Sequence, residues 1–482
     1  MPVQLRRSSN SQAPPAAPDP FFRSLRVRRR VFAALVLALA AFGFTSVRAR
    51  AQVENVAKHD SDFTCYTVAG AAILAGQDPY VVTNPRGWHY LYPPLFAIMV
   101  APLDRLHPQL QALVWFFASV VLAFGCYFEC ARLASFILHS DPIKAALREP
   151  PAWLSFTPFL SIFLFGITCL ELGQVSIALL YLLLLGLRLV LCGRSALAWA
   201  GGGLVLAGAA ALKVVPALPA GLLLAALVVR PRGATSPRQR GWRTFAMTGG
   251  LAAGVLTFFF LLPALLVGWR TNLRHLDSLT NRVLFNPNLG VVAHINITGP
   301  GNQSFRYAAR NLGNWVVSGG TLVPKVTEIP LPEEGTPSDA PPARAAIRGV
   351  LGLGLLALLA AGWRLARSGG TLELAVFFSL ACAEILVLSP ISWSHGFVML
   401  LPAVLFVPWW FYQQGRQRLA LAIAAIPIAL ELQHYLLRST LRLVGVLGVG
   451  TALWTVAVCA LIVILPTALS ARQTSDAVVA GT

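Results

Sequence analysis

The chain has 482 residues, of which 56% are hydrophobic and only 12% are charged. Soluble globular proteins carry about 25% charged and 45–50% apolar residues, so this composition excludes a soluble enzyme, a secreted disulfide scaffold and a disordered protein. In a soluble protein the net charge of +19 would suggest nucleic-acid binding. Here the basic residues cluster at the ends of apolar runs, as in cytoplasmic loops of membrane proteins. The sequence therefore predicts an all-α polytopic membrane protein that binds no nucleic acid.

The N-terminal segment, residues 1–30, is rich in Pro, Ser and Ala and holds seven arginines against one aspartate. This composition predicts a disordered basic tail on the cytoplasmic side. Residues 31–47 form the first apolar run, and Ala49-Arg50-Ala51 after it resembles a signal-peptide cleavage site. Because the tail is long and the run exceeds a usual signal sequence, an uncleaved first span is the favoured interpretation.

Further apolar runs predict the rest of a bundle of about 11–13 transmembrane helices. They lie near residues 91–103, 109–138, 153–171, 174–191, 197–212, 214–229, 245–267, 345–363, 371–389, 396–411, 419–433 and 443–466. We expect one membrane domain over residues 31–470, followed by a short cytoplasmic tail, 471–482.

Arginine-rich connections predict which loops share a side of the membrane. Residues 230–243 hold five arginines and no acid, so this loop is expected to be cytoplasmic. It follows that the connections 268–345 and 389–395 are extracytoplasmic, as is 49–90 when counted from the N-terminus. The two counts differ by one crossing between residues 91 and 229. The suspect is the proline-bounded run 91–103, since thirteen helical residues span about 20 Å, less than the roughly 30 Å of a bilayer core.

The first extracytoplasmic loop places carboxylates next to the membrane. Asp60 and Asp62 follow closely after the first span, and residues 63–76 have the spacing of a short helix lying in the interface. The alternative is a hydrophilic flank that simply keeps the loop in water. Aromatic residues that fit an interfacial belt follow in the same loop: Trp88, Tyr90 and Tyr92.

A sharp turn between two later spans, residues 389–395, is a second candidate site. Pro390 is expected to end a helix, and Ser392 or Ser394 can cap the next one. His395 would then lie at the mouth of the bundle. A histidine at a membrane interface can also be a simple amphipathic residue.

The 268–345 connection is too long for a plain linker. In it, Arg306 and Arg310 are spaced to share one helix face, where paired guanidiniums can bind a phosphate; the alternative is a surface helix whose arginines reach the headgroups. Lys213, between two apolar runs, could likewise pair with a lipid phosphate or reach the interface. Cys126 and Cys130 share a helix face, but without further ligands they are read as small buried residues.

Several short motifs, taken in order over residues 60–400, resemble glycosyltransferase family 87 of the multi-spanning GT-C superfamily. Each motif alone is weak, whereas their order is fairly specific. They are Asp62, Tyr66, Gly76–Tyr80, Tyr92–Leu95, Leu172–Val175, Lys213–Pro216, Gly301–Ser304 and Ser389–His395.

The resemblance implies a GT-C-like fold with its site in the extracytoplasmic loops and a polyprenyl-phosphate-mannose-dependent α-mannosyltransferase activity. Its inverting transfer uses a first-loop acid as general base, which corresponds to Asp62, with Asp60 as the alternative, while the family's Trp-x-His turn corresponds to His395. The chain departs from many relatives at Ser394 and Gly396, where these carry a second histidine or an acid, and in residues 311–344.

The resulting expectation is a membrane hexosyltransferase of the plasma (inner) membrane. Its partners are a polyprenyl-phosphate sugar, a glycolipid or glycan acceptor and membrane lipids, with no cofactor and no metal. Arg306, Arg310 and Lys213 are expected at the donor phosphate. The expected substrate groove comprises Tyr66, Tyr80, Tyr92, Gln174, Asn302, Gln303, Ser304 and Trp393. The alternative is a polytopic transporter or lipid flippase, although the chain lacks the internal repeat common in transporters.

Overall fold

The structure, a computed structural model, describes residues 61–139, 151–229, 237–285, 341–436 and 445–465 apart from single positions, and parts of 29–44 and 302–308. Within these ranges the regular structure is helical, and the only extended pairings are two isolated bridges, Thr83 with His89 and Asn302 with Trp393. The all-α prediction is confirmed.

Seven of the described helical stretches are long and apolar enough to cross a membrane. They are α4 (Pro108–His139), Gly241–Val267 from α10 (Pro237–Val255), η4 (Leu256–Leu261) and α11 (Leu262–Val267), Ile347–Ser368 of α15 (Pro341–Ser368), α16 (Thr371–Leu388), Ser394–Gln413 from η6 (Ser394–Leu400) and α17 (Leu401–Gln413), α18 (Gln417–Leu436) and α20 (Val446–Ile464). The chain is therefore a polytopic membrane protein, as the composition predicts.

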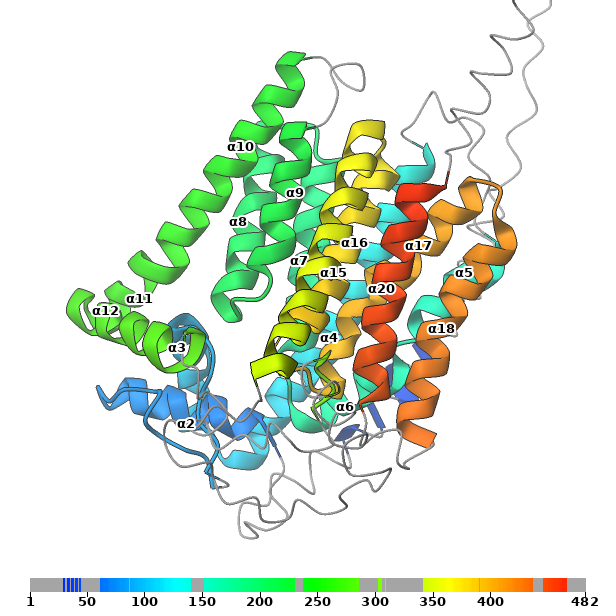
Figure 1. Cartoon of the computed structure of the whole chain (residues 1–482). Coiled ribbons are helices and arrows are strands. Elements are labelled where there is room, and N and C mark those ends of the chain that lie inside the picture. Colours follow the sequence, from blue (N-terminus) through cyan, green and yellow to red (C-terminus); the bar gives the residue numbers. More distant parts are fainter. Residues whose placement is uncertain are drawn as a thin grey trace, which may run out of the picture.

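Shorter apolar helices run beside these spans (Figure 1). They are α5 (Ala152–Leu160), α6 (Phe163–Leu172), α7 (Ser176–Cys192), α8 (Ala196–Leu212) and α9 (Ala217–Val229). At 1.5 Å per residue, the 17 residues of α7 or α8 extend about 26 Å. The predicted run 153–171 is divided into α5 and α6 by a break after Leu160, two residues beyond Pro158.

Helices α16 and α17 form the centre of the bundle. Every residue of α16 from Leu372 to Val387 is buried, and so is every residue of α17 from Leu401 to Phe411. A helix that is apolar on all sides belongs in the interior. Helix α16 contacts its central neighbour α17 and also α9, α15 and α20, and these last three helices lie between it and the surroundings.

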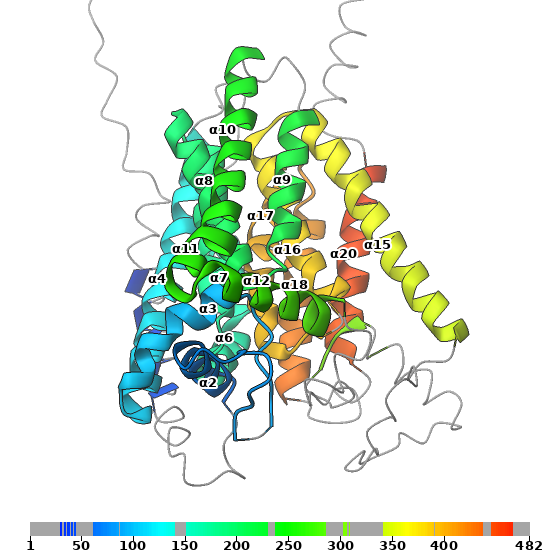
Figure 2. The ribbon, with the colours of Figure 1, turned by 90° about the vertical axis from the view of Figure 1, so that its left-hand side faces the viewer.

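One end of the bundle is closed by elements that do not cross it (Figure 2). Helix α2 (Phe63–Leu74) lies across this end, and α3 (Pro94–Val100) continues through η2 (Ala101–Arg105) to the start of α4. Helix α3 has seven residues, about 10 Å of helix. The suspected run 91–103 therefore does not cross, which removes the disagreement between the two topology counts.

Two predicted boundaries were wrong, and several predictions lie outside the described residues. The loop predicted at 230–243 ends earlier, because α10 already begins at Pro237. The connection 268–345 begins as helix, with α12 (Trp269–Ser278) and the π-helical turn η5 (Leu279–Leu284). The tails 1–28 and 466–482, most of the first span and residues 309–340 are outside the described range.

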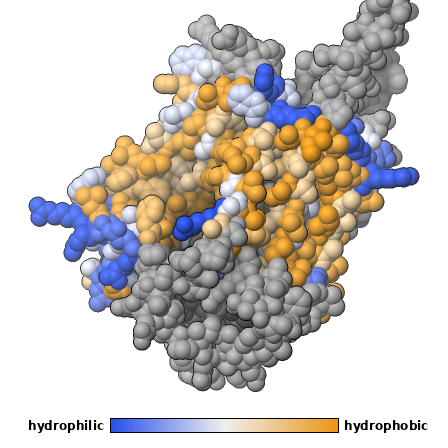
Figure 3. Space-filling model, in the orientation of Figure 1, coloured by the Kyte–Doolittle hydropathy of each residue, from blue (hydrophilic) through white to orange (hydrophobic). Residues whose placement is uncertain are grey.

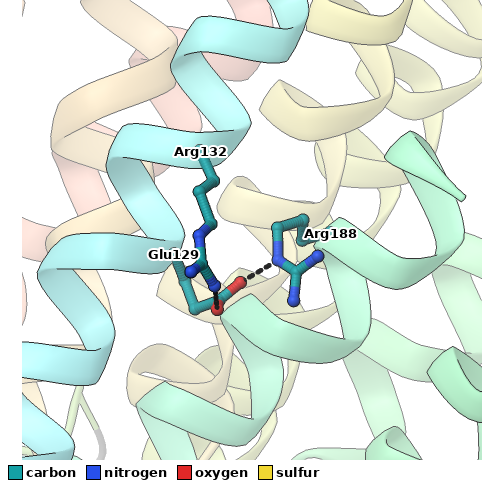
Figure 4. A network of polar contacts seen from close by, with 3 residues as sticks. All are labelled: Glu129, Arg132 and Arg188. Atoms are coloured by element: carbon teal, nitrogen blue, oxygen red, sulfur yellow. Dashed lines mark hydrogen bonds and ion pairs between the residues drawn. The ribbon is translucent and has the colours of Figure 1, made fainter.

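A buried ion pair joins two of the helices away from this closed end (Figure 4). Glu129 of α4 is 3% exposed and accepts hydrogen bonds from Arg188 of α7 and, at 3.2 Å, from Arg132 one turn along α4. A carboxylate inside a membrane bundle is costly unless it is paired. Its position lies about 30 Å along α4 from Pro108, so the pair belongs to the scaffold rather than to the site described below.

Candidate functional site

Asp62 immediately precedes α2 at the closed end of the bundle. The helix packs its residues onto α3 and η2 so tightly that a Cβ at Gly70 would lie 2.8 Å from the Cα of Ala101. The short helix expected at 63–76 is present as Phe63–Leu74 and lies across the end of the bundle rather than along the spans (Figure 1). As a result, the partly exposed Asp62 is held at the surface of the bundle end.

The turn between α6 and α7 brings Gln174 to Asp62. Gly173 has a left-handed backbone with φ of 66°, and a side chain there would meet the Cβ of Phe63 at 2.6 Å, so only glycine fits this position. The turn is fixed by Trp115, whose indole donates to the Gly173 carbonyl at 2.7 Å. Gln174 then donates from Nε2 to the Asp62 carboxylate. This contact joins residues 112 positions apart.

Two tyrosines extend this hydrogen-bonded group. The Tyr66 hydroxyl donates to Oε1 of Gln174 at 3.1 Å and is hydrogen-bonded to the Tyr92 hydroxyl at 3.1 Å. Burial raises the pKa of Tyr66 well above its ordinary value, with further contributions from Tyr92 and Asp62. Burial likewise raises the pKa of Tyr92. Both hydroxyls therefore stay protonated and serve as hydrogen-bonding groups, and the Gln174 amide is oriented with its NH₂ toward Asp62.

The segment that carries Tyr92 is fixed by other tyrosines of the first loop. The Tyr80 hydroxyl donates to the Tyr92 carbonyl at 2.7 Å, and the Tyr90 hydroxyl donates to the Pro93 carbonyl at 2.7 Å. Tyr80 and Tyr90 are 2% and 1% exposed. Tyr90, expected in an interfacial aromatic belt, is thus buried inside the loop, and the equally buried Tyr80 supports the Tyr92 backbone.

Lys213 brings a positive charge to the same place. It follows the last residue of α8, and its Nζ lies 5.4 Å from the centre of the Tyr92 ring, within cation–π range. Burial lowers the pKa of Lys213, whereas the Asp62 carboxylate raises it. In Figure 3 a hollow with hydrophilic atoms inside it opens in the hydrophobic surface near the end of α8.

His395 lies near enough to Lys213 for the ammonium charge to act on its imidazole. It belongs to η6, is 4% exposed, and its Nδ1 has no hydrogen-bond partner among the described residues. Lys213 therefore interacts with both Asp62 and His395, which are 333 positions apart in the sequence. A carboxylate, an ammonium and an imidazole therefore share one end of the bundle. The carboxylate or the imidazole can accept a proton, and the ammonium can stabilise a negatively charged group beside them.

The capping role predicted for Ser392 or Ser394 was wrong. Trp393 stands at the N-terminus of η6 without a side-chain cap. The hydroxyl of Ser392 turns back and donates to the Leu386 carbonyl at 2.7 Å, so it satisfies the end of α16. The last carbonyls of a helix lack partners within the helix. Ser392 bonds to one of these carbonyls and does not cap the next helix.

The segment 302–304 is attached to this turn. Asn302 is 1% exposed, and its Oδ1 accepts the backbone N–H groups of Ser392 at 3.1 Å and Ser304 at 3.0 Å. The backbone of Gln303 donates to the Ser392 carbonyl at 2.7 Å. Asn302, Gln303 and Ser304, predicted to line a substrate groove, are buried against the turn that carries His395. The Asn302 side chain and the Gln303 backbone are therefore placed to position that turn.

Helix α20 supports this segment from the other side. A Cβ at Gly448 would lie 1.8 Å from the Gln303 carbonyl oxygen. We expect Gly448→Ala to lower the thermal unfolding midpoint, because overpacking costs about 1–3 kcal/mol and must displace the 302–304 backbone. Gly352→Ala on α15, where nothing lies within 4 Å, is the matched control. Scanning fluorimetry in detergent measures the unfolding midpoint of both variants, and an equal midpoint would contradict this packing.

Other predicted residues are not brought to the site. Asp60, Arg306 and Arg310 lie outside the described residues, and their roles stay predictions. Among the described residues no group of three or more His, Cys, Asp or Glu side chains could hold a metal ion.

Sequence reasoning missed Gly173 and Trp115 as positioning residues. The Leu-Gly-Gln-Val motif contained a signal for Gly173, since glycine after an apolar run is typical of a left-handed helix end.

Comparison with known proteins gives one match. The sequence model of glycosyltransferase family 87 matches residues 90–390, which is more than half of the chain. Tyr92, Gln174, Lys213 and the 302–304 segment are inside the matched range, whereas Asp62 and His395 lie outside it. No curated protein and no solved structure matches the chain.

Proposed function

Because the chain belongs to glycosyltransferase family 87, we propose that it transfers a sugar from a polyprenyl-phosphate donor to a glycolipid or glycan acceptor. Mannose is the first candidate for that sugar. A donor that is already dissolved in the bilayer needs no nucleotide-binding loop. Its phosphate would lie at the membrane surface, at the level of the bundle end where Asp62 and Lys213 lie.

The observation that carries this proposal is the position of the Asp62 carboxylate. It is held by Gln174 on a partly exposed turn at the bundle end, within electrostatic range of Lys213. A hydroxyl needs a proton acceptor as it attacks, and a positioned carboxylate supplies one, worth typically 10²–10⁴ in rate. The leaving phosphate needs a positive partner, and a preorganised cation supplies that.

In the proposed reaction the acceptor oxygen attacks the anomeric carbon from the face opposite the phosphate, so the configuration inverts. Its proton passes to Asp62 as the new carbon–oxygen bond forms. The bond between the anomeric carbon and the phosphate oxygen breaks, and the polyprenyl phosphate keeps the electron pair. Lys213 stabilises that phosphate, and Arg306 and Arg310 are further candidates for the same role. His395 would orient the acceptor or the Asp62 carboxylate.

We place the site on the extracytoplasmic side of the plasma (inner) membrane. The support is the charge pattern, with seven arginines in residues 1–30 and five in 230–243, which favours the cytoplasm for both segments. Helix α10 begins within the second segment at the end of the bundle opposite α2 (Figure 1). The loops that carry Asp62 and His395 would then face away from the cytoplasm.

The test is a transfer assay in sealed proteoliposomes of the purified protein, sorted by orientation. Radiolabelled polyprenyl-phosphate-mannose is placed in the bilayer, and membrane-impermeant glycan acceptors are added outside. We expect label to become covalently attached to an acceptor only where the α2 end faces outward. Matched arms with polyprenyl-phosphate-glucose and with nucleotide-linked mannose define the donor. Movement of intact labelled lipid between leaflets without a new glycosidic bond would instead indicate a flippase.

A further inference from the structure

Helix α12 has features that the proposed reaction does not use. It follows directly on the candidate span Gly241–Val267, and Gly268, with φ of 86°, turns the chain between α11 and α12. The helix then lies across the bundle rather than along it, at the same end as α2 and α3 (Figures 1 and 2). A helix that follows a span and lies across the end of the bundle is placed at the boundary between the bilayer core and its headgroups.

The inner face of α12 is polar and fixes the rotation of the helix. Asn272, 0% exposed, donates from Nδ2 to the Phe259 carbonyl at 2.9 Å, within the π-helical turn η4, whose wider spacing leaves carbonyls accessible. Ser278 donates to Oδ2 of Asp78 at 2.7 Å. His275 is also buried and lies close enough to Asp78 to interact with it. The opposite face is therefore directed outward by specific contacts.

That outward face combines apolar and basic residues in two adjacent stripes. Trp269 and Leu273 are 52% and 42% exposed and form one stripe at i, i+4. Arg270 and Arg274 form the neighbouring stripe, and both are exposed. Arg274 donates to the Thr271 hydroxyl at 3.2 Å, which uses only part of its guanidinium.

The same pattern continues into η5. Arg282 is exposed, and Phe285 immediately after η5 is 77% exposed. The one acidic residue of the face is Asp277, which accepts a hydrogen bond from Asn281 at 2.8 Å. Three arginines against one acid leave the face positive. The apolar stripe fits acyl chains, and the basic stripe fits the phosphates one layer above them.

We propose that the outward face of α12 and η5 binds the phosphate headgroups of anionic phospholipids of the surrounding bilayer. The charge of the face selects anionic over zwitterionic lipids, because juxtamembrane arginines are attracted to a negative lipid surface. The two stripes lie side by side on a helix whose rotation is fixed, so the guanidiniums and the tryptophan engage a single lipid layer together.

The bound lipids would also act on the first loop. Ser278 of α12 holds Asp78, and Asp78 in turn accepts the backbone N–H of Tyr80 at 2.9 Å. Tyr80 holds the Tyr92 carbonyl. Lipid binding that keeps α12 in place would thus stabilise the segment that carries Tyr92. This last consequence rests on the proposed function, whereas the lipid site itself does not.

The test uses the full-length protein in nanodiscs of phosphatidylcholine with about 25% phosphatidylglycerol, so that both lipids are in excess of the protein. Native mass spectrometry then measures the enrichment of phosphatidylglycerol among retained lipids. We expect the double variant Arg270→Gln, Arg274→Gln to lower this enrichment by about fivefold or more, from the attraction of each arginine to anionic lipid. The matched control is Arg194→Gln, Arg418→Gln, two exposed arginines at the opposite end, which should retain the enrichment of this site.

Equal enrichment in the wild type and the Arg270/Arg274 double variant, with an unchanged unfolding midpoint, would overturn the proposal. A lower midpoint directs the test to the single variant Arg270→Gln, because Arg270 lies on the outward face and Arg274 contacts Thr271. The lipid count is independent of sugar transfer. Failure of the transferase proposal therefore leaves this measurement intact, and loss of lipid selectivity alone leaves the transferase proposal standing.

Discussion

Asp62→Asn is expected to lower sugar transfer by about 10²–10⁴ while the protein stays folded. The amide keeps the shape of the carboxylate, and its oxygen can still accept the hydrogen bond from Gln174. What is lost is the proton acceptor for the attacking hydroxyl. The measurement is the single-turnover rate with labelled lipid donor in nanodiscs. A separate donor-binding assay should show nearly unchanged affinity.

His395→Ala tests whether His395 acts together with Asp62 in the proposed reaction. The buried ring leaves Nδ1 without a partner among the described residues, as expected of a group that meets a ligand. The single variant should lose most activity, and the double variant with Asp62→Asn should be little worse than Asp62→Asn alone, because residues acting as a unit are not additive. Near-normal transfer by Asp62→Asn would end the assignment and make Asp60 the next residue to test. Additive losses would separate His395 from the base.

Lys213→Met is expected to lower the transfer rate by about 10²–10³, the usual effect of removing one preorganised group that stabilises charge in the transition state. Methionine keeps most of the length of the side chain and its packing over the Tyr92 ring. The loss should therefore appear mainly in the rate of the chemical step. Lys213→Arg keeps the positive charge and should recover part of the activity.

The pH dependence distinguishes a charge effect from a packing effect. Burial lowers the pKa of Lys213 from its ordinary value of 10.5, so the ammonium loses its proton at a lower pH than a free lysine. Activity should accordingly fall on the alkaline side below pH 10.5 in the wild type. In Lys213→Arg this fall should move to higher pH, because guanidinium stays protonated. An identical alkaline limb in both proteins would remove Lys213 from the charge-stabilising role.

Hydrophobic runs and arginine counts predicted most of the fold. They identified the long spans, the run 91–103 that does not cross, and the short helix at 63–76. They could not predict the break after Leu160 or the start of α10 at Pro237. Periodicity is the same on both sides of such boundaries, and their placement is decided by tertiary packing. The helix in Trp269–Ser278 was missed because its inward residues are polar rather than apolar.

Several residues of the candidate site lie together in the structure, but the sequence did not predict their contacts. Asp62, Gln174, Tyr66 and Tyr92 do meet, and Lys213 is near them, yet sequence patterns gave no reason for Gln174 to face Asp62 from 112 positions away. Nor did they predict that the Asn302 side chain would accept the backbone N–H of Ser392, 90 positions away. Local patterns report the period of a helix, and contacts of this separation depend on how whole helices pack.

The packing of α20 against residues 302–304 has a consequence for the order in which the protein is made. A Cβ at Gly448 of this last described helix, or at Gly445 just before it, would collide with Gln303 or Ala308, more than 130 positions earlier in the chain. During synthesis from the N-terminus, the segment that holds the turn of His395 has nothing behind it until α20 has entered the membrane. We therefore expect a chain truncated before Gly445 to lack the packing that supports residues 302–304 and, through them, the turn of His395.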